Sequence, residues 1–337
     1  MKLGVFRKAA REIVFPCIVG IGADKLLSAF AGNGLLNIMY HGVVEKDSNY
    51  FSPRHLVRDQ FERQLVYIKK NFDIVTQEEA FKIVNEKRKL SRKTVAISFD
   101  DGFANNLDTA LPLLEKHNVP VTIFISTMGL VEDSVLCQWA EYIAALRYFH
   151  PNVQFELNGL HFDQFYNSKH NVTLNDFIKS RPYGERDVLL KELIEKYDLD
   201  NKIKRIPSEI WQLLSPDQLR KLSISDKINI GSHAHSHYNL ANISTVHAQE
   251  ELSKSKKILE DVIQKPINSI AYPDGSYSDT IKDIAEREGY LYQLAVNYKS
   301  DSDILDSRIL NRHGLSNTTT FESNILTLNN AFRKKAN

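Results

Sequence analysis

The chain has 337 residues, 42% hydrophobic and 25% charged, a composition typical of a soluble globular protein with one large core or two modest ones. Its formal net charge is +1 and acids and bases are mixed along its length, so it lacks the basic stripe that nucleic-acid binding requires. Only Cys17 and Cys137 are present, which excludes a disulfide framework and a cysteine-rich zinc site.

The N-terminal segment, residues 1–34, predicts an amphipathic helix. Basic residues precede an apolar run at 13–23 that Pro16 interrupts and that is too short to span a membrane. Apolar residues between Leu3 and Cys17 fall near one helical face, and no A-x-A cleavage site follows. Packing on the domain, peripheral membrane contact and an export signal stay open as alternatives. We expect a protein that is cytoplasmic or peripheral to the inner membrane, with export as the remaining alternative.

From residue 35 onward, strand-like and helix-like segments alternate. The first half predicts a strand at 35–40, a helix at 56–70, a short strand at 73–76, a helix from 76, a strand at 95–99, a helix at 106–117 and a strand at 119–126. Between 130 and 216 the alternation breaks into mixed helices and loops, with one strand-like run at 153–157. This stretch indicates a mostly helical insertion.

The alternation resumes after the insertion. It predicts a helix at 216–222, a strand at 228–231, a helix at 245–264, a strand at 267–272, a helix at 278–288, a strand at 291–296 and a final helix with a basic tail at 321–337. Repeated strand–helix units with connections of helical length favour parallel strands and right-handed crossovers. The predicted fold is α/β, a barrel-like domain at 35–320 that the insertion at 130–216 divides.

Polar groups follow several of the predicted strands directly. The string SFDDG places Asp100 and Asp101 after one strand, and GSHAHSH places His233 and His237 after another. In α/β folds, catalytic groups gather beyond the carboxyl ends of the strands. A carboxylate and two neutral imidazoles suit a divalent cation that polarises water. We therefore predict a hydrolytic metal site held by Asp101, His233 and His237, with Asp100 as the base for the activated water.

Plainer interpretations accompany these residues. An Asp-Asp-Gly after a strand is most often a turn or a helix cap, and the histidine pair is what favours catalysis here. His235 lies between the two ligand positions and is expected to be a supporting or surface group. Trp139, Trp211 and Tyr272 are candidates for stacking on sugar rings, although aromatic side chains usually belong to the core.

The strings MYHGV, SFDDG, GSHAHSH and AYPDG, in this order, resemble the polysaccharide deacetylase family, also called the NodB-homology or carbohydrate esterase 4 family. The resemblance spans about residues 35–313 and implies a distorted (β/α) barrel. It further implies a metal-dependent hydrolase that removes N-acetyl groups from an amino-sugar-containing polysaccharide or oligosaccharide. The implied cofactor is a divalent metal, zinc by preference, with cobalt, nickel or manganese as alternatives. We expect the substrate to be a bacterial cell-surface polysaccharide or exopolysaccharide.

The resemblance assigns roles to single residues. It implies that Asp100 is the catalytic base and that Asp101, His233 and His237 bind the metal. It also implies that the backbone N–H of Asp274, in the Pro-Asp-Gly turn, helps to hold the oxyanion.

Two departures from the family pattern bear on the mechanism. Ala271 stands where many members have an arginine that orients the catalytic aspartate. The segment LYQLAV lacks the histidine that many members use as general acid. His41, which follows Tyr40 at the first strand end, is expected to take that task, as the resemblance to Tyr-His-containing exopolysaccharide deacetylases implies. His313 is the second candidate.

Other functions stay open. An O-acetyl esterase or another amide hydrolase would use the same site. A catalytically silent carbohydrate-binding homologue is the third possibility, and Ala271 motivates it. In each glycan-directed case the expected partner is an acetylated glycan.

Overall fold

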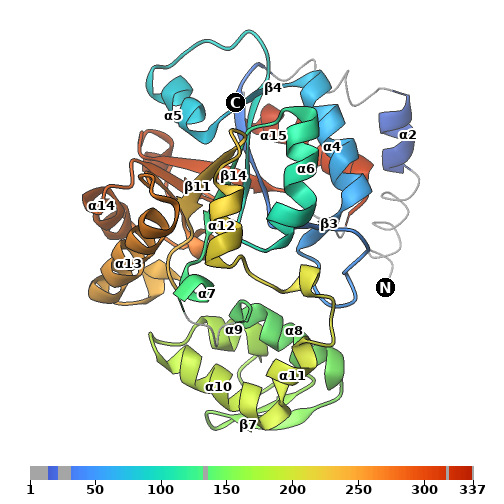
Figure 1. Ribbon diagram of the computed structural model, residues 1–337, viewed down its shortest axis with the longest axis vertical. Coiled ribbons are helices and arrows are strands. Elements are labelled where there is room, and N and C mark those ends of the chain that lie inside the picture. The colour runs from blue at the N-terminus through green and yellow to red at the C-terminus, as the bar shows by residue number, and fades with distance from the viewer. Residues whose placement is uncertain (1–13, 22–31, 132–135, 316–318, 336–337) are drawn as a thin grey trace.

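The computed structural model describes residues 14–21, 32–131, 136–315 and 319–335 (Figure 1). None of the helices in these ranges is long and apolar enough to cross a membrane. The amphipathic helix predicted for residues 1–34 lies mostly outside the described ranges. Residues 14–21 contain a short helix, α2 (Phe15–Gly20), with Pro16 in its first turn, where a missing N–H costs nothing. Helix α2 packs against the C-terminal helix, α15 (Phe321–Lys335).

Within the described residues, seven parallel strands form a closed ring in the order β1, β14, β13, β12, β11, β6 and β5, with β5 pairing back to β1. An eighth strand, β4, pairs with the first half of β5, and β6 pairs with the second half. The ring confirms the predicted α/β barrel. The bounds are β1 Leu35–Tyr40, β4 Asp73–Val75, β5 Thr94–Phe99, β6 Val121–Ile125, β11 Ile228–Ser232, β12 Ser269–Ala271, β13 Tyr292–Ala295 and β14 Ile309–Gly314.

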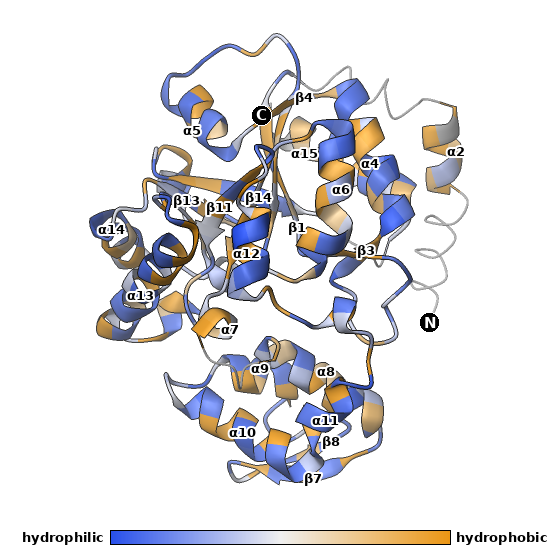
Figure 2. Ribbon diagram, viewed as in Figure 1, coloured by the Kyte–Doolittle hydropathy of each residue, from blue (hydrophilic) through white to orange (hydrophobic). Residues whose placement is uncertain are grey.

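Helices cover the outside of the ring, and Figure 2 shows apolar residues along the strands and on the helices. They are α4 Arg58–Asn71, α6 Leu111–His117, α12 Pro216–Leu222, α13 Thr245–Ile263 and α14 Asp279–Arg287, with α15 from the C-terminus. The main core joins alternate residues of the strands, such as Leu36 and Ile38, to helix residues such as Phe61. The side chains between them, such as Asn37, face the barrel interior.

Helix α5 (Gln77–Asn85) packs against the barrel interior. Its Phe81 is fully buried in a small cluster with one side chain from each of four strands: Phe124, Ala271, Leu294 and Leu310. The Gln77 side chain donates a hydrogen bond to Asn37 Oδ1, 2.9 Å away. Helix α5 therefore excludes water from the end of the barrel where these residues lie, and leaves the carboxyl ends of the strands for the site.

Two predicted helices begin later than their apolar pattern indicated. The segment before α4 forms a strand, β3 (His55–Val57), which pairs in parallel with β2 (Gly42–Val44) beyond the end of β1. The helix predicted from residue 106 starts as a π-helical turn, Asn106–Ala110, and becomes α-helical at α6. Pro112 has no N–H to donate four residues back, so a regular α-helix cannot run unbroken from 106 to 117.

The insertion packs around a core of its own, which contains residues such as Tyr142, Phe162 and Leu189. Figure 1 shows it as a separate lobe in green and yellow beside the barrel. Its helices are α8 Trp139–Phe149, α9 Leu174–Lys179, α10 Glu185–Tyr197 and α11 Leu199–Ile203, and the short helix α7 (Met128–Val131), whose Leu130 packs in the barrel core, precedes them. An antiparallel sheet joins them, with β7 Gln154–Leu157, β8 Leu160–Asp163, β9 Tyr166–Asn167 and β10 Val172–Thr173.

The strand-like run at 153–157 corresponds to β7, but β8, β9 and β10 were not predicted. The missed sequence feature is Asn158-Gly159, which forms a two-residue loop between β7 and β8 with φ of +49° and +72°. Asn-Gly favours such positive φ angles and is typical of tight hairpins. The insertion is therefore helical with a small sheet.

Candidate active site

Asp100 and Asp101 follow β5 and are almost completely buried, at 3% and 1% exposure. Every residue of β5 is buried, so the strand carries the two carboxylates into the protein interior. Asp101 has a left-handed φ of +72°, which is uncommon for a residue with a side chain and marks local backbone strain. Gly102 follows with φ +81°, a conformation that favours glycine. The sharp turn lets the adjacent carboxylates meet different partners.

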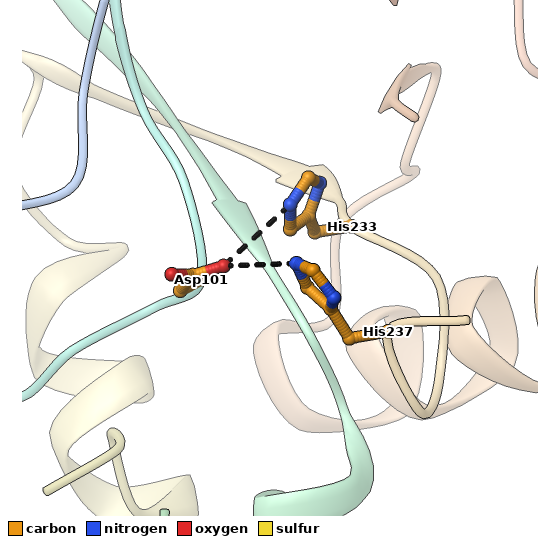
Figure 3. Close-up of side chains that lie close together, drawn as sticks. All are labelled: Asp101, His233 and His237. Carbon is orange, nitrogen blue, oxygen red and sulfur yellow. Dashed lines mark ion pairs between the residues drawn. The ribbon is translucent and has the colours of Figure 1, made fainter. Parts of the chain in front are cut away.

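The two ligand histidines follow β11. The His233 ring nitrogen Nδ1 lies 2.7 Å from the carbonyl oxygen of Ala271, a contact that fixes the ring and leaves Nε2 toward Asp101. His233 Nε2 lies 3.6 Å from Asp101 Oδ1, and His237 Nε2 lies 3.3 Å from the same oxygen (Figure 3). The structure therefore brings the three predicted ligands together from two distant segments of the chain.

The residues of this triad fit a divalent cation. One candidate ligand atom from each lies within 4.8 Å of the other two. Asp101 Oδ1 is buried and accepts no hydrogen bond of good geometry from the described part of the chain, which is costly for a carboxylate oxygen. One carboxylate and two imidazoles also form the donor set of a catalytic zinc site with an open position. The role of the three residues as metal ligands stays a prediction.

The surroundings of the triad residues decide which of them are charged. Burial alone would raise the pKa of Asp101, but the nearby His237 imidazole, together with the charges of His41 and Arg54, outweighs burial and holds that pKa well below the ordinary value. Burial likewise opposes the charged form of His237, and Asp101 reverses this effect, so the pKa of His237 is raised. The pKa of His233 is lowered by burial, only partly offset by Asp100. Asp101 is therefore ionised at neutral pH and His233 is neutral, whereas His237 has to lose its proton before a cation binds.

Arg312 is the functional residue that sequence reasoning missed. Its side chain is fully buried and donates from Nη1 to Asp100 Oδ1 at 2.6 Å and from Nη2 to Asp100 Oδ2 at 2.8 Å. A further bond of 3.2 Å runs to Ser98 Oγ, and the guanidinium lies 5.4 Å from the Phe124 ring centroid. Burial would raise the pKa of Asp100, but the Arg312 charge and bonds lower it overall.

The contact between Arg312 and Asp100 replaces the one expected from an arginine at position 271, where this chain has Ala271. Ala271 lies on β12, whereas Arg312 lies on β14, with β13 between them in the ring. The guanidinium that binds Asp100 thus comes from a different strand from the one that the resemblance implied. A sequence feature was present, because a charged residue inside a buried strand needs an opposite charge. No local sequence pattern indicated which residue supplied that opposite charge.

His41 follows β1 and lies beside the site carboxylates. Burial lowers the pKa of His41, while the charges of Asp101 and Asp100 oppose that effect. Tyr40 belongs to the core, and its hydroxyl donates to Gln64 Oε1 at 2.9 Å. The charges of Asp100 and Asp101 thus act on His41, and its role as general acid stays a prediction.

His313 follows Arg312 on β14, and successive side chains of a strand point to opposite faces. Arg312 faces Asp100, so His313 belongs to the other face, in register with Ile38 of the outer core. This position disfavours His313 as the proton donor.

Asp274 lies in the 3₁₀ turn Pro273–Gly275 and has φ +54°. Hydrogen bonds from the N–H groups of Gly275 and Ser276 close the turn, at 2.9 Å each. The Asp274 carboxylate pairs with Lys179 Nζ at 2.5 Å, and its charge helps to raise the pKa of His237. The turn therefore lies near the histidine loop, and the oxyanion role of the Asp274 N–H stays a prediction.

The remaining candidate side chains from the sequence lie either in the core or beside a cavity. His235 is buried, which excludes the surface alternative, and its Nδ1 lies 2.9 Å from Thr127 Oγ1 rather than against the triad. Tyr272 is fully buried and donates to Gln293, and Trp211 donates to the Ile206 carbonyl, so both are core residues. Trp139 is mostly buried and lines a cavity of about 400 Å³ beside His235.

Arg54 is a second residue that the sequence did not indicate. Its guanidinium donates to Asp101 Oδ2 at 3.3 Å and forms a close ion pair with Glu141 of α8. The Arg54 side chain is 25% exposed, whereas Glu141 is fully buried. Arg54 therefore occupies the oxygen of Asp101 that faces away from the histidines and leaves Oδ1 for a cation.

A family model for polysaccharide deacetylases matches residues 87–293, a range that includes both aspartates, both ligand histidines and Asp274. The chain belongs to the polysaccharide deacetylase family. YxkH of Bacillus subtilis (strain 168), whose own assignment as a polysaccharide deacetylase is provisional, is 20% identical over 254 residues. The match covers 75% of this deacetylase-family chain and 61% of YxkH, so the chain spans less than two thirds of that relative.

Solved structures share the fold of this polysaccharide deacetylase family member. The Streptococcus pyogenes deacetylase PplD, in complex with acetate, has a TM-score of 0.52 and 18% identity, covering 88% of this chain and 97% of PplD. IcaB from Ammonifex degensii has a TM-score of 0.56 and 16% identity, covering 88% and 98%. A de-N-acetylase from Aggregatibacter actinomycetemcomitans has a TM-score of 0.54 and 18% identity, with the same coverage. These similarities support the (β/α) barrel assigned from the strand order.

Metal binding tests the triad directly. Replacing His237 with alanine removes one of three protein ligands, so we expect bound zinc or cobalt to be lost after dialysis, as measured by elemental analysis. His235→Gln is the matched control, because His235 lies in the same loop and faces Thr127. It should retain metal. An unchanged metal content in His237→Ala would remove that histidine from the ligand set.

Proposed function

We propose that this member of the polysaccharide deacetylase family removes N-acetyl groups from an amino-sugar-containing polysaccharide or oligosaccharide by metal-dependent hydrolysis. The supporting observation is the convergence of Asp101, His233 and His237 on one point, with the separate ionised carboxylate of Asp100 beside them. The similarity to a de-N-acetylase structure supports an amide substrate. The proposed substrate is a bacterial cell-surface polysaccharide or exopolysaccharide.

Asp101, His233 and His237 would hold the cation, with zinc preferred for this set of one oxygen and two nitrogen donors. When bound, such a cation supplies Lewis acidity toward water and the acetyl carbonyl. The protein side chains then have two remaining tasks. An N-acetyl amide is a poor electrophile with a poor leaving group, so hydrolysis also needs a base for the attacking water and a proton for the departing nitrogen.

Asp100 serves as the base in this proposal. Its two oxygens are bound side by side by Arg312, which fixes the plane of the carboxylate and keeps it ionised. Asp100 Oδ2 lies 4.0 Å from His233 Nε2, so the base is next to the candidate ligands without belonging to them. Asp100 accepts the proton that water loses as it attacks the acetyl carbon.

His41 and Asp274 complete the proposed mechanism. The backbone N–H of Asp274 donates to the oxyanion as negative charge develops on the carbonyl oxygen. His41 in its charged form gives a proton to the sugar nitrogen, and the amine leaves. The contact between Arg312 and Asp100 also argues against the catalytically silent alternative, since the missing arginine at Ala271 was what motivated it.

The base assignment is tested with Asp100→Asn. The amide keeps the shape but does not accept a proton from water, so we expect normal metal content and a kcat lower by about 10²- to 10⁴-fold. Acetate release from N-acetylglucosamine oligomers with added zinc or cobalt measures it. Near-full activity of the variant would overturn the assignment. If the metal-loaded wild-type protein released acetate from no N-acetylated glycan, the proposed function itself would be wrong.

The acid assignment is tested with His41→Gln and His313→Gln. A general acid works only when protonated, so its deprotonation makes kcat fall on the alkaline side of the pH profile. We expect His41→Gln to lose that alkaline decline and to lower kcat by about 10²-fold or more. His313→Gln should keep the wild-type profile. The reverse pattern would transfer the task to His313.

The role of Arg312 is tested with Arg312→Lys. Lysine keeps the charge but loses the two parallel bonds, so the pKa of Asp100 should rise. A base is active above its pKa, and the acidic limb of the kcat profile should therefore move to higher pH, with kcat lower by about tenfold. Arg308→Lys is the control, because Arg308 directly precedes the same strand but is bound to Asp306, Asp283 and Glu286. Identical profiles for the two variants would contradict the role.

A further inference from the structure

Charged side chains of the insertion reach all three loops of the candidate site. Glu141 of α8 binds Arg54, which binds Asp101. Lys179 of α9 pairs with Asp274 in the proline turn. Arg186 of α10 hydrogen-bonds the loop that carries His233 and His237, and its side chain is much more buried than that of Lys179, at 3% against 33% exposure.

The histidine loop has a backbone that needs external support. Ala234 and His237 have left-handed φ angles of +60° and +56°. Such conformations are strained for residues with side chains and persist only when the surroundings impose them. One of the two strained residues is itself a candidate ligand. The position of its imidazole therefore depends on what holds the loop.

Arg186 holds the loop by its carbonyl groups. Its Nη2 donates to the carbonyl of Ser236 at 2.7 Å, and its Nη1 donates to the carbonyl of His237 at 3.0 Å. The side chain is only 3% exposed, so these bonds are shielded from water. A guanidinium presents two parallel donors in a fixed plane, which suits two consecutive carbonyls.

The orientation of Arg186 is fixed in turn by its neighbours. The guanidinium carbon lies 3.5 Å from the centroid of the Tyr238 ring. Asp187 accepts from Arg186 Nε at 3.1 Å and from the Tyr238 hydroxyl at 2.8 Å. The Gly184 N–H donates to that hydroxyl at 3.0 Å. Arg186 is therefore held rigidly between its helix and the end of the histidine loop.

The barrel holds the same loop from the other side. Glu251 of α13 is buried and accepts from the backbone N–H groups of His235, at 3.0 Å, and Ser236, at 2.7 Å. The loop is thus bound through its N–H groups by a carboxylate of the barrel and through its carbonyl groups by a guanidinium of the insertion. Loss of either partner leaves buried backbone groups without hydrogen bonds.

We propose that Arg186 is a positioning residue for the metal ligand His237, so that the insertion is a structural part of the metal site. This inference rests on the proposed metal-dependent function. Without Arg186 the carbonyls of Ser236 and His237 lose their partners, the strained backbone at His237 relaxes, and the imidazole nitrogen moves away from Asp101. The metal is then held by fewer protein atoms.

The test is a titration of the full chain with Co²⁺, followed by its visible absorption and by competition with a chelator. Arg186→Gln should bind Co²⁺ about 10- to 100-fold more weakly than the wild type, the usual effect of losing a residue that orients a ligand. Its absorption spectrum should also change, because the coordination changes. Arg181→Gln is the control, since Arg181 lies in the same insertion, packs on the Phe177 ring and donates to a backbone carbonyl outside the histidine loop.

Each outcome decides the proposal. Equal Co²⁺ affinities for Arg186→Gln and Arg181→Gln would overturn it, even if Arg186→Gln lowered the melting temperature of the metal-free protein. If Arg186→Gln does not fold, Arg186→Lys replaces it, because lysine keeps the charge and reaches fewer acceptors in this planar arrangement. Arg186→Lys should bind Co²⁺ several-fold more weakly than Arg181→Lys, and equal affinity would overturn the proposal. A wild-type protein that binds no metal would instead refute the proposed function, and the inference with it.

Discussion

Two adjacent carboxylates, Asp100 and Asp101, are buried at the end of one barrel strand, and the rest of the site compensates their charge. Neighbouring negative charges in a medium of low dielectric are tolerated only when each has its own positive or hydrogen-bonding partners. Asp100 has Arg312, which binds both of its oxygens. Asp101 has Arg54 on one oxygen, while the other faces two imidazole nitrogens and accepts no hydrogen bond of good geometry from the described residues. This difference between the two aspartates matches the proposed roles of Asp100 as base and Asp101 as metal ligand.

Backbone strain recurs at the loops of the site, although positive φ angles also occur elsewhere in the described residues. Asp101, His237 and Asp274 each adopt a left-handed conformation, with φ of +72°, +56° and +54°. They come from three loops that follow different strands, so one irregular segment does not explain the coincidence. A closed ring of parallel strands with helices packed around it is rigid enough to impose such conformations at its strand ends. The strain turns each of these residues out of strand geometry at the end of the barrel where the site lies.

The sequence was sufficient for the barrel and for the gathering of the triad, because both depend on local patterns. Apolar runs mark the strands, and the polar strings that follow them meet wherever parallel strands end together. Arg312 could not be found in this way. It lies 212 residues from Asp100, and pairing between the two follows from ring closure and from which face of β14 turns inward, neither of which a local pattern contains. The support of the histidine loop by Arg186 was missed for a similar reason, since α10 belongs to a segment with no regular alternation. The hairpin at Asn158-Gly159, by contrast, carried a recognisable local feature.

The site lies where two separately packed cores meet. The barrel core fixes the strand ends, and the insertion core fixes the helices that carry Glu141, Lys179 and Arg186. Each site loop is therefore bonded on one side to the barrel and on the other to the insertion, and the cavity of about 400 Å³ beside His235 is lined by residues of both.

Loops that bind a substrate usually vary freely on a rigid scaffold. Here the insertion has less freedom, because a change in its packing is transmitted through Arg186 to His237 and through Arg54 to Asp101. The insertion that lines this cavity is thus also a segment that the candidate ligands depend on for their geometry.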